Sequence, residues 1–387
     1  MSTNSNRIKF LGILFLVSSI VFVYGFIAGS YEIFPYDILK DVKREVIPQK
    51  LCGFSPEDFP QIYQTNVTSL IKLNSYEDIK QKRGDIIDYI WKGNLTYNSI
   101  PIKIEKNITD LRFDMNDIKQ IDKITIEMDY GVNSIAYILF PKISTDTEKI
   151  QNVDSLVIYH QGHKGDFADH GKNTIEELLK NNYTVMAFSM PLHGQNNQPI
   201  VDIPNHGIFK IEYHNHFLYL DNSNFSSLKY FFEPIMKSLN YLDENYSFEK
   251  YHMIGLSGGG WTTMVYPAID PRINHSYAVS GGYPEYLQQM IGMGHYERNH
   301  SVLLDIVNYP EIYVMSSVGE NRKSVHISIE WDTGYRCGNF AQTYDEPIRK
   351  SVKQLGSGIF KTYLDSSIID HKISDESLSI ILEELKS

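Results

Sequence analysis

The second half of the chain alternates short apolar runs with longer stretches of helical hydrophobic period. The apolar runs predict strands, and the periodic stretches between them predict helices. Such alternation is typical of a mostly parallel sheet with helices on both faces, so we predict the α/β class. The predicted strands are 155–159, 184–189, 251–256, 276–280, 324–331 and 359–364, and the predicted helices are 172–181, 226–243, 258–268, 340–354 and 375–386.

The segment before this alternation predicts a hairpin rather than a strand-helix repeat. Two apolar runs, 124–128 and 134–141, flank an Asp-Tyr-Gly turn, and a short helix is expected near 78–90. Two long stretches, 193–223 and 282–323, show no regular period and follow strands. Ligands bind at the carboxyl ends of strands in such sheets, so we expect these stretches, 282–323 above all, to form pocket walls.

The N-terminus has the pattern of a membrane segment. Residues 10–29 carry no charge and are long enough to cross a hydrocarbon layer of ~30 Å. We therefore predict a cytoplasmic segment 1–9, a transmembrane signal anchor 10–29, a juxtamembrane spacer 30–84 and a main domain 85–387. The alternative is a cleaved signal peptide, with the small residues 28–30 as its processing site.

Composition and charge limit the classes of binding partner that we expect. The formal net charge of -11 and the lack of a basic stripe argue against nucleic acid as a partner. An excess of N-x-S/T sequons favours an extracytoplasmic main domain, and the two cysteines, Cys52 and Cys337, leave open whether a disulfide forms. The oligomeric state stays open too. The sequons are at Asn66, Asn94, Asn107, Asn182, Asn224, Asn245, Asn274 and Asn299.

One pentapeptide carries a chemical signature. Residues 255–259 read Gly-Leu-Ser-Gly-Gly and match G-x-S-x-G, the nucleophile elbow in which a tight strand-to-helix turn exposes a serine, here Ser257. A predicted strand ends just before the motif and a predicted helix begins just after it, as an elbow requires. The alternative is a glycine-rich turn with an idle serine.

From about residue 85 to its end the chain resembles the α/β-hydrolase superfamily, and GLSGGGWTT resembles the elbow of its esterase/lipase-like serine hydrolases. The resemblance implies an acid after the serine and a histidine last in sequence. Asp332, at the end of a predicted strand, fits the acid, with Asp305 and Glu330 as rivals. His371, between the last predicted strand and the last helix, fits the base. A capping role for Asp332 and an idle surface His371 are the alternatives.

These three residues predict hydrolysis of a small-molecule carboxylic ester without a cofactor. His371 would take the proton of Ser257 as it attacks, and Asp332 would orient the imidazole, giving an acyl-enzyme. The resemblance also implies an oxyanion hole made by the amide of Gly258 and one from the loop 160–163. That loop reads His-Gln-Gly-His rather than HGGG, so either Gly162 or His163 could supply the second amide.

Three other interpretations stay open. The same triad could cleave peptides, or the fold could serve as an inactive surface binding protein. The loop after the strand 155–159 also contains possible metal ligands, namely His160, His163, Asp166, Asp169 and His170. Because their spacing differs from common metal motifs and a catalytic loop explains the same residues, we predict no metal site.

Overall fold

The computed structural model describes most of the chain, and its contacts divide the chain into two units, residues 1–54 and 55–387. In the first unit, residues 12–25 form a helix, and the rest of the predicted segment 10–29 lies outside the described residues. No described helix is both long and apolar enough for a bilayer crossing. Cys52 and Cys337 also lie outside the described residues, which are 12–25, 64–95, 98–101, 103–144, 152–203, 206–291, 295–332 and 339–386.

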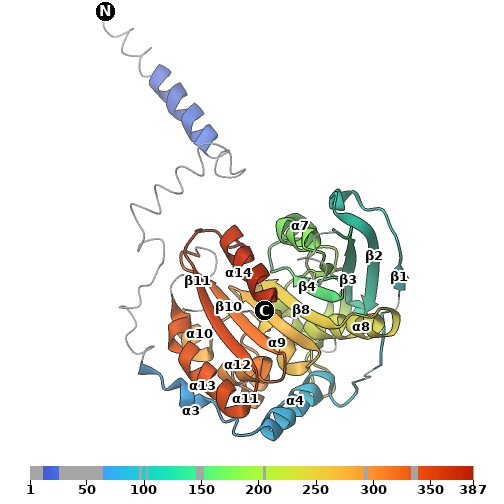
Figure 1. Ribbon diagram of the computed structural model, residues 1–387. Coiled ribbons are helices and arrows are strands. Elements are labelled where there is room, and N and C mark those ends of the chain that lie inside the picture. Colours follow the sequence, from blue (N-terminus) through green and yellow to red (C-terminus); the bar gives the residue numbers. More distant parts are fainter. Residues whose placement is uncertain are drawn as a thin grey trace, which may run out of the picture. The chain divides into compact units, whose positions relative to one another are not determined.

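A nine-stranded sheet forms the centre of the second unit (Figure 1). The strand order is β1-β2-β3-β5-β4-β8-β9-β10-β11; the strands from β5 to β11 run parallel, and the pairs that involve β1, β2 and β3 are antiparallel. The prediction of a mostly parallel sheet is therefore confirmed. The strands are β1 (Lys103–Glu105), β2 (Ile118–Glu127), β3 (Asn133–Pro141), β4 (Ser155–His160), β5 (Thr184–Phe188), β8 (Lys250–Leu256), β9 (Ile273–Val279), β10 (Lys323–Ile329) and β11 (Ile359–Asp365).

Helices cover both faces of this sheet (Figure 1). Apolar side chains of α7 and α14 pack with Val157, Ile254 and Val325 on one face, whereas α9, α12 and α13 contact the strands on the other face. Buried on both faces, the central strands read as continuous apolar runs, which made them easy to predict. The helices are α3 (Val67–Leu70), α4 (Tyr76–Trp91), α6 (Phe167–His170), α7 (Lys172–Lys180), α8 (Lys229–Asn245), α9 (Gly258–Ile269), α10 (Glu285–Ile291), α11 (Ser301–Ile306), α12 (Tyr309–Ser317), α13 (Asp345–Leu355) and α14 (Asp375–Leu385).

Helix α4 has a well-defined start. Ser75 and Asp78 form a capping box, in which each side chain accepts a hydrogen bond from the other residue's backbone amide. The helix is longer than the sequence pattern predicted, and it spans the expected boundary between residues 84 and 85.

The two long stretches are more regular than their sequences suggested. The first contains a small hairpin, β6 (Ile200–Ile203) and β7 (Gly207–Lys210), and a 3-10 helix, η5 (His214–Tyr219). The second contains α10, α11 and α12. Every residue of α12 is buried, and the helix packs on α9, where the Trp261 indole donates a hydrogen bond to the Tyr309 hydroxyl at 2.8 Å. A helix that is buried all round has no polar face, so it shows no amphipathic period.

The order of the strands reverses beside β4. The chain passes from β4 to β5 on one side, and β8 pairs with β4 on the other side. The carboxyl ends of β4 and β8 therefore border a topological switch point, where ligands bind in open α/β sheets. The loop 161–166 follows β4, and Ser257 follows β8.

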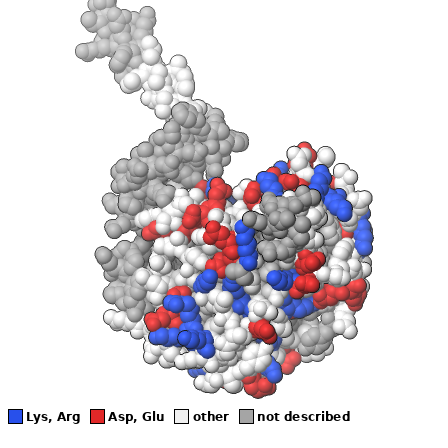
Figure 2. Space-filling model, in the orientation of Figure 1, with Lys and Arg blue, Asp and Glu red and all other residues white. Residues whose placement is uncertain are grey.

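The visible surface offers no broad charged stripe. Figure 2 shows acidic and basic side chains intermixed on the face drawn.

Candidate active site

Ser257 lies in a strained turn between β8 and α9. Its φ of 58° and ψ of -116° are rare for a residue with a side chain, and such strain is found where surrounding structure enforces it. The flanking glycines are sterically required, because a Cβ on Gly255 would lie 2.2 Å from the Gly259 carbonyl oxygen and one on Gly259 would lie 2.0 Å from that of His160. The predicted elbow geometry is therefore present.

Asp332 and His371 are in contact beyond β10 and β11. The His371 Nδ1 atom lies 2.6 Å from Asp332 Oδ2, and Asp332 is only 1% exposed. A carboxylate can only accept a hydrogen bond, so Nδ1 carries the proton and Nε2 has the basic lone pair. The rival Asp305 is an exposed residue of α11.

Ser280 was missed by the sequence analysis. Its hydroxyl donates to Asp332 Oδ2 at 3.0 Å, so the buried carboxylate has a second donor besides His371. Ser280 directly follows β9. The carbonyl oxygen of the preceding residue, Val279, accepts a hydrogen bond from the Ser257 amide at 2.9 Å. A short path of contacts thus leads from the elbow through the end of β9 to the Asp332–His371 pair. A polar residue at the end of a predicted strand was the only available signal.

The loop after β4 lies directly against the elbow. A Cβ on Gly162 would come within 2.7 Å of Ser257 Cβ and 2.8 Å of the Leu256 carbonyl oxygen. A Cβ on Gly258 would come within 2.5 Å of the His163 ring. The backbone of this loop and the first turn of α9 are therefore close neighbours, as the residues expected in an oxyanion hole must be.

His163 also belongs to a cluster of histidines around one buried acid. Its Nε2 atom lies 3.0 Å from Glu297 Oε1 and 3.1 Å from Nδ1 of His214, which in turn lies 3.0 Å from Glu297 Oε2. The ring of His295 stacks on that of His163 with centroids 4.3 Å apart, and His193 meets His163 edge to face.

Burial sets the protonation of this cluster. It lowers the pKa of His163 to about 3 and that of His193 to about 4, so both rings are neutral at pH 7. Burial acts to raise the pKa of Glu297, but the electrostatic contacts of its carboxylate with His214 and His163 hold that pKa well below its usual range. His163 and His193 are therefore neutral imidazoles near an ionised, buried carboxylate.

Of the metal ligands considered from the sequence, His163 alone belongs to the group with metal-binding geometry among the described residues. His160 is buried and its Nδ1 lies 3.0 Å from the Gln161 carbonyl oxygen, while Asp166 caps α6 by accepting the Ala168 amide at 2.9 Å. Among the described residues, the group with metal-binding geometry combines His163 with His295 and Glu297 instead.

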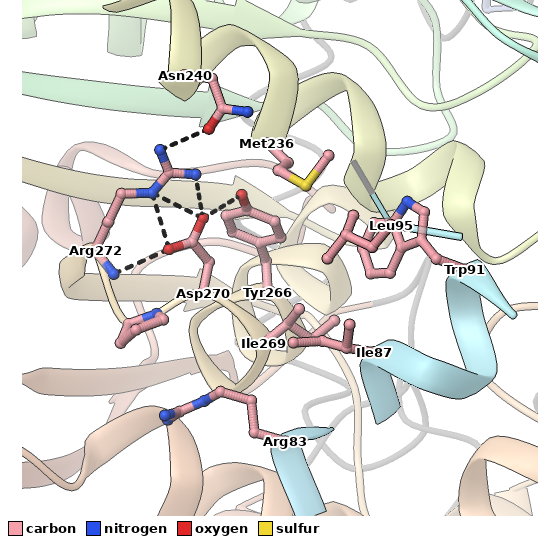
Figure 3. Close-up of a pocket in the computed structure, with 11 residues that line it drawn as sticks. Arg83, Ile87, Trp91, Leu95, Met236, Asn240, Tyr266, Ile269, Asp270 and Arg272 are labelled. Carbon is pink, nitrogen blue, oxygen red and sulfur yellow. Dashed lines mark hydrogen bonds and ion pairs between the residues drawn. The ribbon is translucent and has the colours of Figure 1, made fainter. Parts of the chain in front are cut away.

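The cavities in the described part of the second unit include the following two. One, of 590 Å³, is lined by His295 and by residues of η5 and α11. The other, of 370 Å³, is lined mostly by apolar side chains, with the Asp270–Arg272 ion pair at one side (Figure 3). That cavity contacts the last turn of α9, and twelve helical residues span ~18 Å, so it is remote from Ser257.

No protein-family profile matches the chain, and no curated protein matches its sequence. The fold does match solved structures. Acetyl xylan esterase from Paenibacillus sp. R4 aligns with 11% identity and a TM-score of 0.52, covering 83% of this chain and 98% of that one. Acetyl xylan esterase 1 from Thermoanaerobacterium sp. JW/SL YS485 aligns with 13% identity and a TM-score of 0.51, covering 83% and 96%.

A glucuronoyl esterase from Solibacter usitatus aligns with 11% identity and a TM-score of 0.50, covering 78% of this chain and 90% of that one. These structures share the α/β-hydrolase architecture, and the order and direction of the strands from β2 to β11 agree with it. The chain therefore has the α/β-hydrolase fold, as its sequence resemblance implied.

Proposed function

We propose that this protein is a serine hydrolase of carboxylic esters, with Ser257 as nucleophile, His371 as general base and Asp332 as the residue that orients the base. The single observation that carries the proposal is the 2.6 Å contact of His371 with the buried Asp332, at the sheet edge where the elbow also lies. Esterases among the structures of the same fold support the reaction class.

The reaction follows from the groups present. Ser257 Oγ attacks the ester carbonyl carbon while its proton passes to His371 Nε2, and Asp332 stabilises the resulting imidazolium. The tetrahedral intermediate collapses, the proton passes to the leaving alcohol, and an acyl-enzyme remains on Ser257. Water then attacks this acyl group with His371 again as base, which releases the carboxylic acid and restores the serine.

The oxyanion would be held by backbone amides. Gly258 opens α9, and the first amides of a helix have no acceptor within the helix and lie at the positive end of its dipole. The second amide would come from Gly162 or His163, whose loop packs on Ser257 and Gly258. One such donor contributes about 3 kcal/mol to transition-state stabilisation.

We also propose that residues 10–29 anchor the protein in a membrane, with the hydrolase unit on the extracytoplasmic side. The uncharged sequence and the helix at 12–25 support an anchor, and exposed sequons such as Asn94, Asn224 and Asn299 support the orientation. We expect the protein to stay in the membrane fraction after carbonate extraction. We also expect its mass to fall on treatment with a glycosidase. Asn182 is fully buried, and its side-chain oxygen accepts a hydrogen bond from the Ser144 amide, so we expect no glycan on this residue.

The activity is tested with p-nitrophenyl esters of graded acyl length. We expect turnover that falls by at least ~10⁴ in Ser257→Ala and in His371→Ala. Ser223→Ala, which removes an exposed serine hydroxyl elsewhere, is the matched control and should keep the normal rate. Turnover of peptides but not esters by the same variants would support the peptidase alternative, and no turnover of either by folded protein would support a binding role.

A further inference from the structure

The segments that meet at His163 contain more metal-ligating groups than the proposed ester chemistry uses. His163 comes from the loop after β4, whereas His295 and Glu297 come from the turn that precedes α11. One ligand atom from each of these three residues lies within 4.8 Å of the corresponding atoms of the other two. We propose that these side chains bind a divalent transition-metal ion of the Zn²⁺ class.

The contact between His163 and Glu297 is the first argument. Their Nε2 and Oε1 atoms are 3.0 Å apart, yet Oε1 accepts no hydrogen bond from any described residue although it is buried. An imidazole nitrogen and a carboxylate oxygen this close, with no N–H directed between them, repel each other unless a cation lies beside both. Ligands at 2.0–2.1 Å from a tetrahedral zinc ion are ~3.3 Å apart, which is close to the separation observed.

The burial of Glu297 is the second argument. The residue is 1% exposed, so each of its carboxylate oxygens needs a donor or a cation beside it. A metal ion would be that partner for Oε1. The other oxygen, Oε2, already has a partner in His214 Nδ1 at 3.0 Å, and Nε2 of His214 is held by the Pro191 carbonyl oxygen at 2.9 Å. This is the arrangement of an outer-shell histidine that orients a ligating carboxylate.

The accessibility of His295 is the third argument. Its side chain is exposed and lines the 590 Å³ cavity, so an ion can reach the site from solvent and the ring can rotate toward it. The rings of His163 and His295 stack with centroids 4.3 Å apart, which places both imidazoles at the site. Two histidines and one glutamate leave a fourth position for water, a set that zinc commonly adopts.

Such an ion would join two segments that are far apart in sequence. The His163 ring contacts the position where a Cβ on Gly258 would lie, and Gly162 lies against Ser257. The ion would thus hold the loop after β4 in place against the elbow. The inference concerns binding alone and does not rest on ester hydrolysis, so the two proposals can fail separately.

The test measures metal binding by the full-length protein without substrate. Protein stripped with a chelator is titrated with Zn²⁺ against a competing indicator, and with Co²⁺ while the visible absorption of the ion is followed. We expect the protein to bind one equivalent of Zn²⁺. His295→Ala should weaken the affinity for this ion at least ~100-fold, because the loss of a ligand should exceed the 10–100-fold effect of outer-shell changes. His295→Cys retains a zinc ligand and should restore binding, with a thiolate–cobalt absorption.

His170→Ala is the matched control, since it removes another exposed histidine, one of the metal ligands that the sequence suggested. It should bind Zn²⁺ like the unaltered protein. Folded protein that takes up no equivalent of Zn²⁺ would overturn the proposal and leave a metal-free His–Glu network. Binding unchanged in His295→Ala, or lost in His170→Ala alone, would overturn it too by locating the ion elsewhere.

Discussion

His371 Nδ1 lies 2.6 Å from Oδ2 of Asp332, although 38 residues separate the two positions in the chain. The contact forms because β10 and β11 are parallel neighbours, so the segments after their carboxyl ends meet at the same edge of the sheet. Asp332 is buried and cannot exchange this partner for water. The pair therefore fixes which imidazole nitrogen faces away from the carboxylate.

Asp332→Asn tests this orientation. An amide can donate to Nδ1, which would favour the tautomer that places the proton on Nε2 and removes the base. We expect kcat for ester hydrolysis to fall by about 10⁴ with little change in thermal stability. Asp305→Asn changes the exposed rival in the same way and should keep its rate. If Asp305→Asn lost the activity and Asp332→Asn kept it, Asp305 rather than Asp332 would be the residue that orients His371.

Ser280→Ala tests a positioning residue. The hydroxyl holds Asp332 at 3.0 Å and is not expected to touch substrate, so its removal should loosen the carboxylate. We expect kcat to fall about 5-fold, which corresponds to about 1 kcal/mol, while KM stays within a factor of two. Steady-state kinetics separate the two parameters. An increase in KM at unchanged kcat would instead mean that Ser280 binds substrate.

Gly162→Ala tests the close approach of the loop after β4 to the elbow. The new methyl group would meet Ser257 Cβ at 2.7 Å and the Leu256 carbonyl oxygen at 2.8 Å, so either the loop or the elbow must move. We expect kcat to fall at least ~100-fold, comparable to the loss of an oxyanion donor.

Gly84→Ala is the control for this substitution. A Cβ at Gly84 meets no atom within 4 Å, and the residue lies inside α4. It should raise the free energy of unfolding by about 0.5–1 kcal/mol and leave kcat unchanged. Normal kcat in Gly162→Ala would show that the loop does not need its present position.

The fold could be predicted from sequence wherever a segment is apolar throughout or has a clear helical hydrophobic period. The central strands are apolar throughout, and the helices 172–181, 258–268 and 375–386 were placed to within a residue or two of α7, α9 and α14. The short strands β1, β6 and β7 carry too few residues to show a period. Helix α12 was missed because it is buried on every side.

The residues of the site also differ in whether the sequence could predict them. Ser257, Asp332 and His371 each follow or end a predicted strand, so parallel-sheet topology alone places them at one edge. Ser280 could not be selected among many serines. His295 and Glu297 lie in a stretch without periodicity, and nothing in the sequence relates them to His163; only the folded chain brings them together.

The stability of the C-terminal helix should depend on pH through Glu384. Burial works against its ionisation, but contacts with Lys361, Tyr363 and Lys323 lower its pKa to about 2. A depressed carboxyl pKa contributes stability above the unfolded value of ~4.3, and this contribution declines as the pH falls from there toward 2. Glu384→Gln should therefore lose about 2 kcal/mol at pH 7, since it leaves the buried Lys323 without its carboxylate.

Urea denaturation at pH 7 and at pH 3 measures this difference. We expect the gap between the unaltered protein and Glu384→Gln to narrow at the lower pH. Glu383→Gln, at the neighbouring exposed position, should match the unaltered protein at both values. A gap that is equal at pH 7 and pH 3 would mean that the charge of Glu384 is not what stabilises the helix.

The proposed nucleophile can be identified directly by covalent labelling. A fluorophosphonate reacts with a serine only when a base activates it, and peptide mapping by mass spectrometry then locates the adduct. The proposed mechanism predicts one adduct per chain, on the peptide that contains Ser257, absent in Ser257→Ala and greatly slowed in His371→Ala. A folded protein that forms no adduct, or forms it on another residue and keeps its rate in Ser257→Ala, would contradict the mechanism.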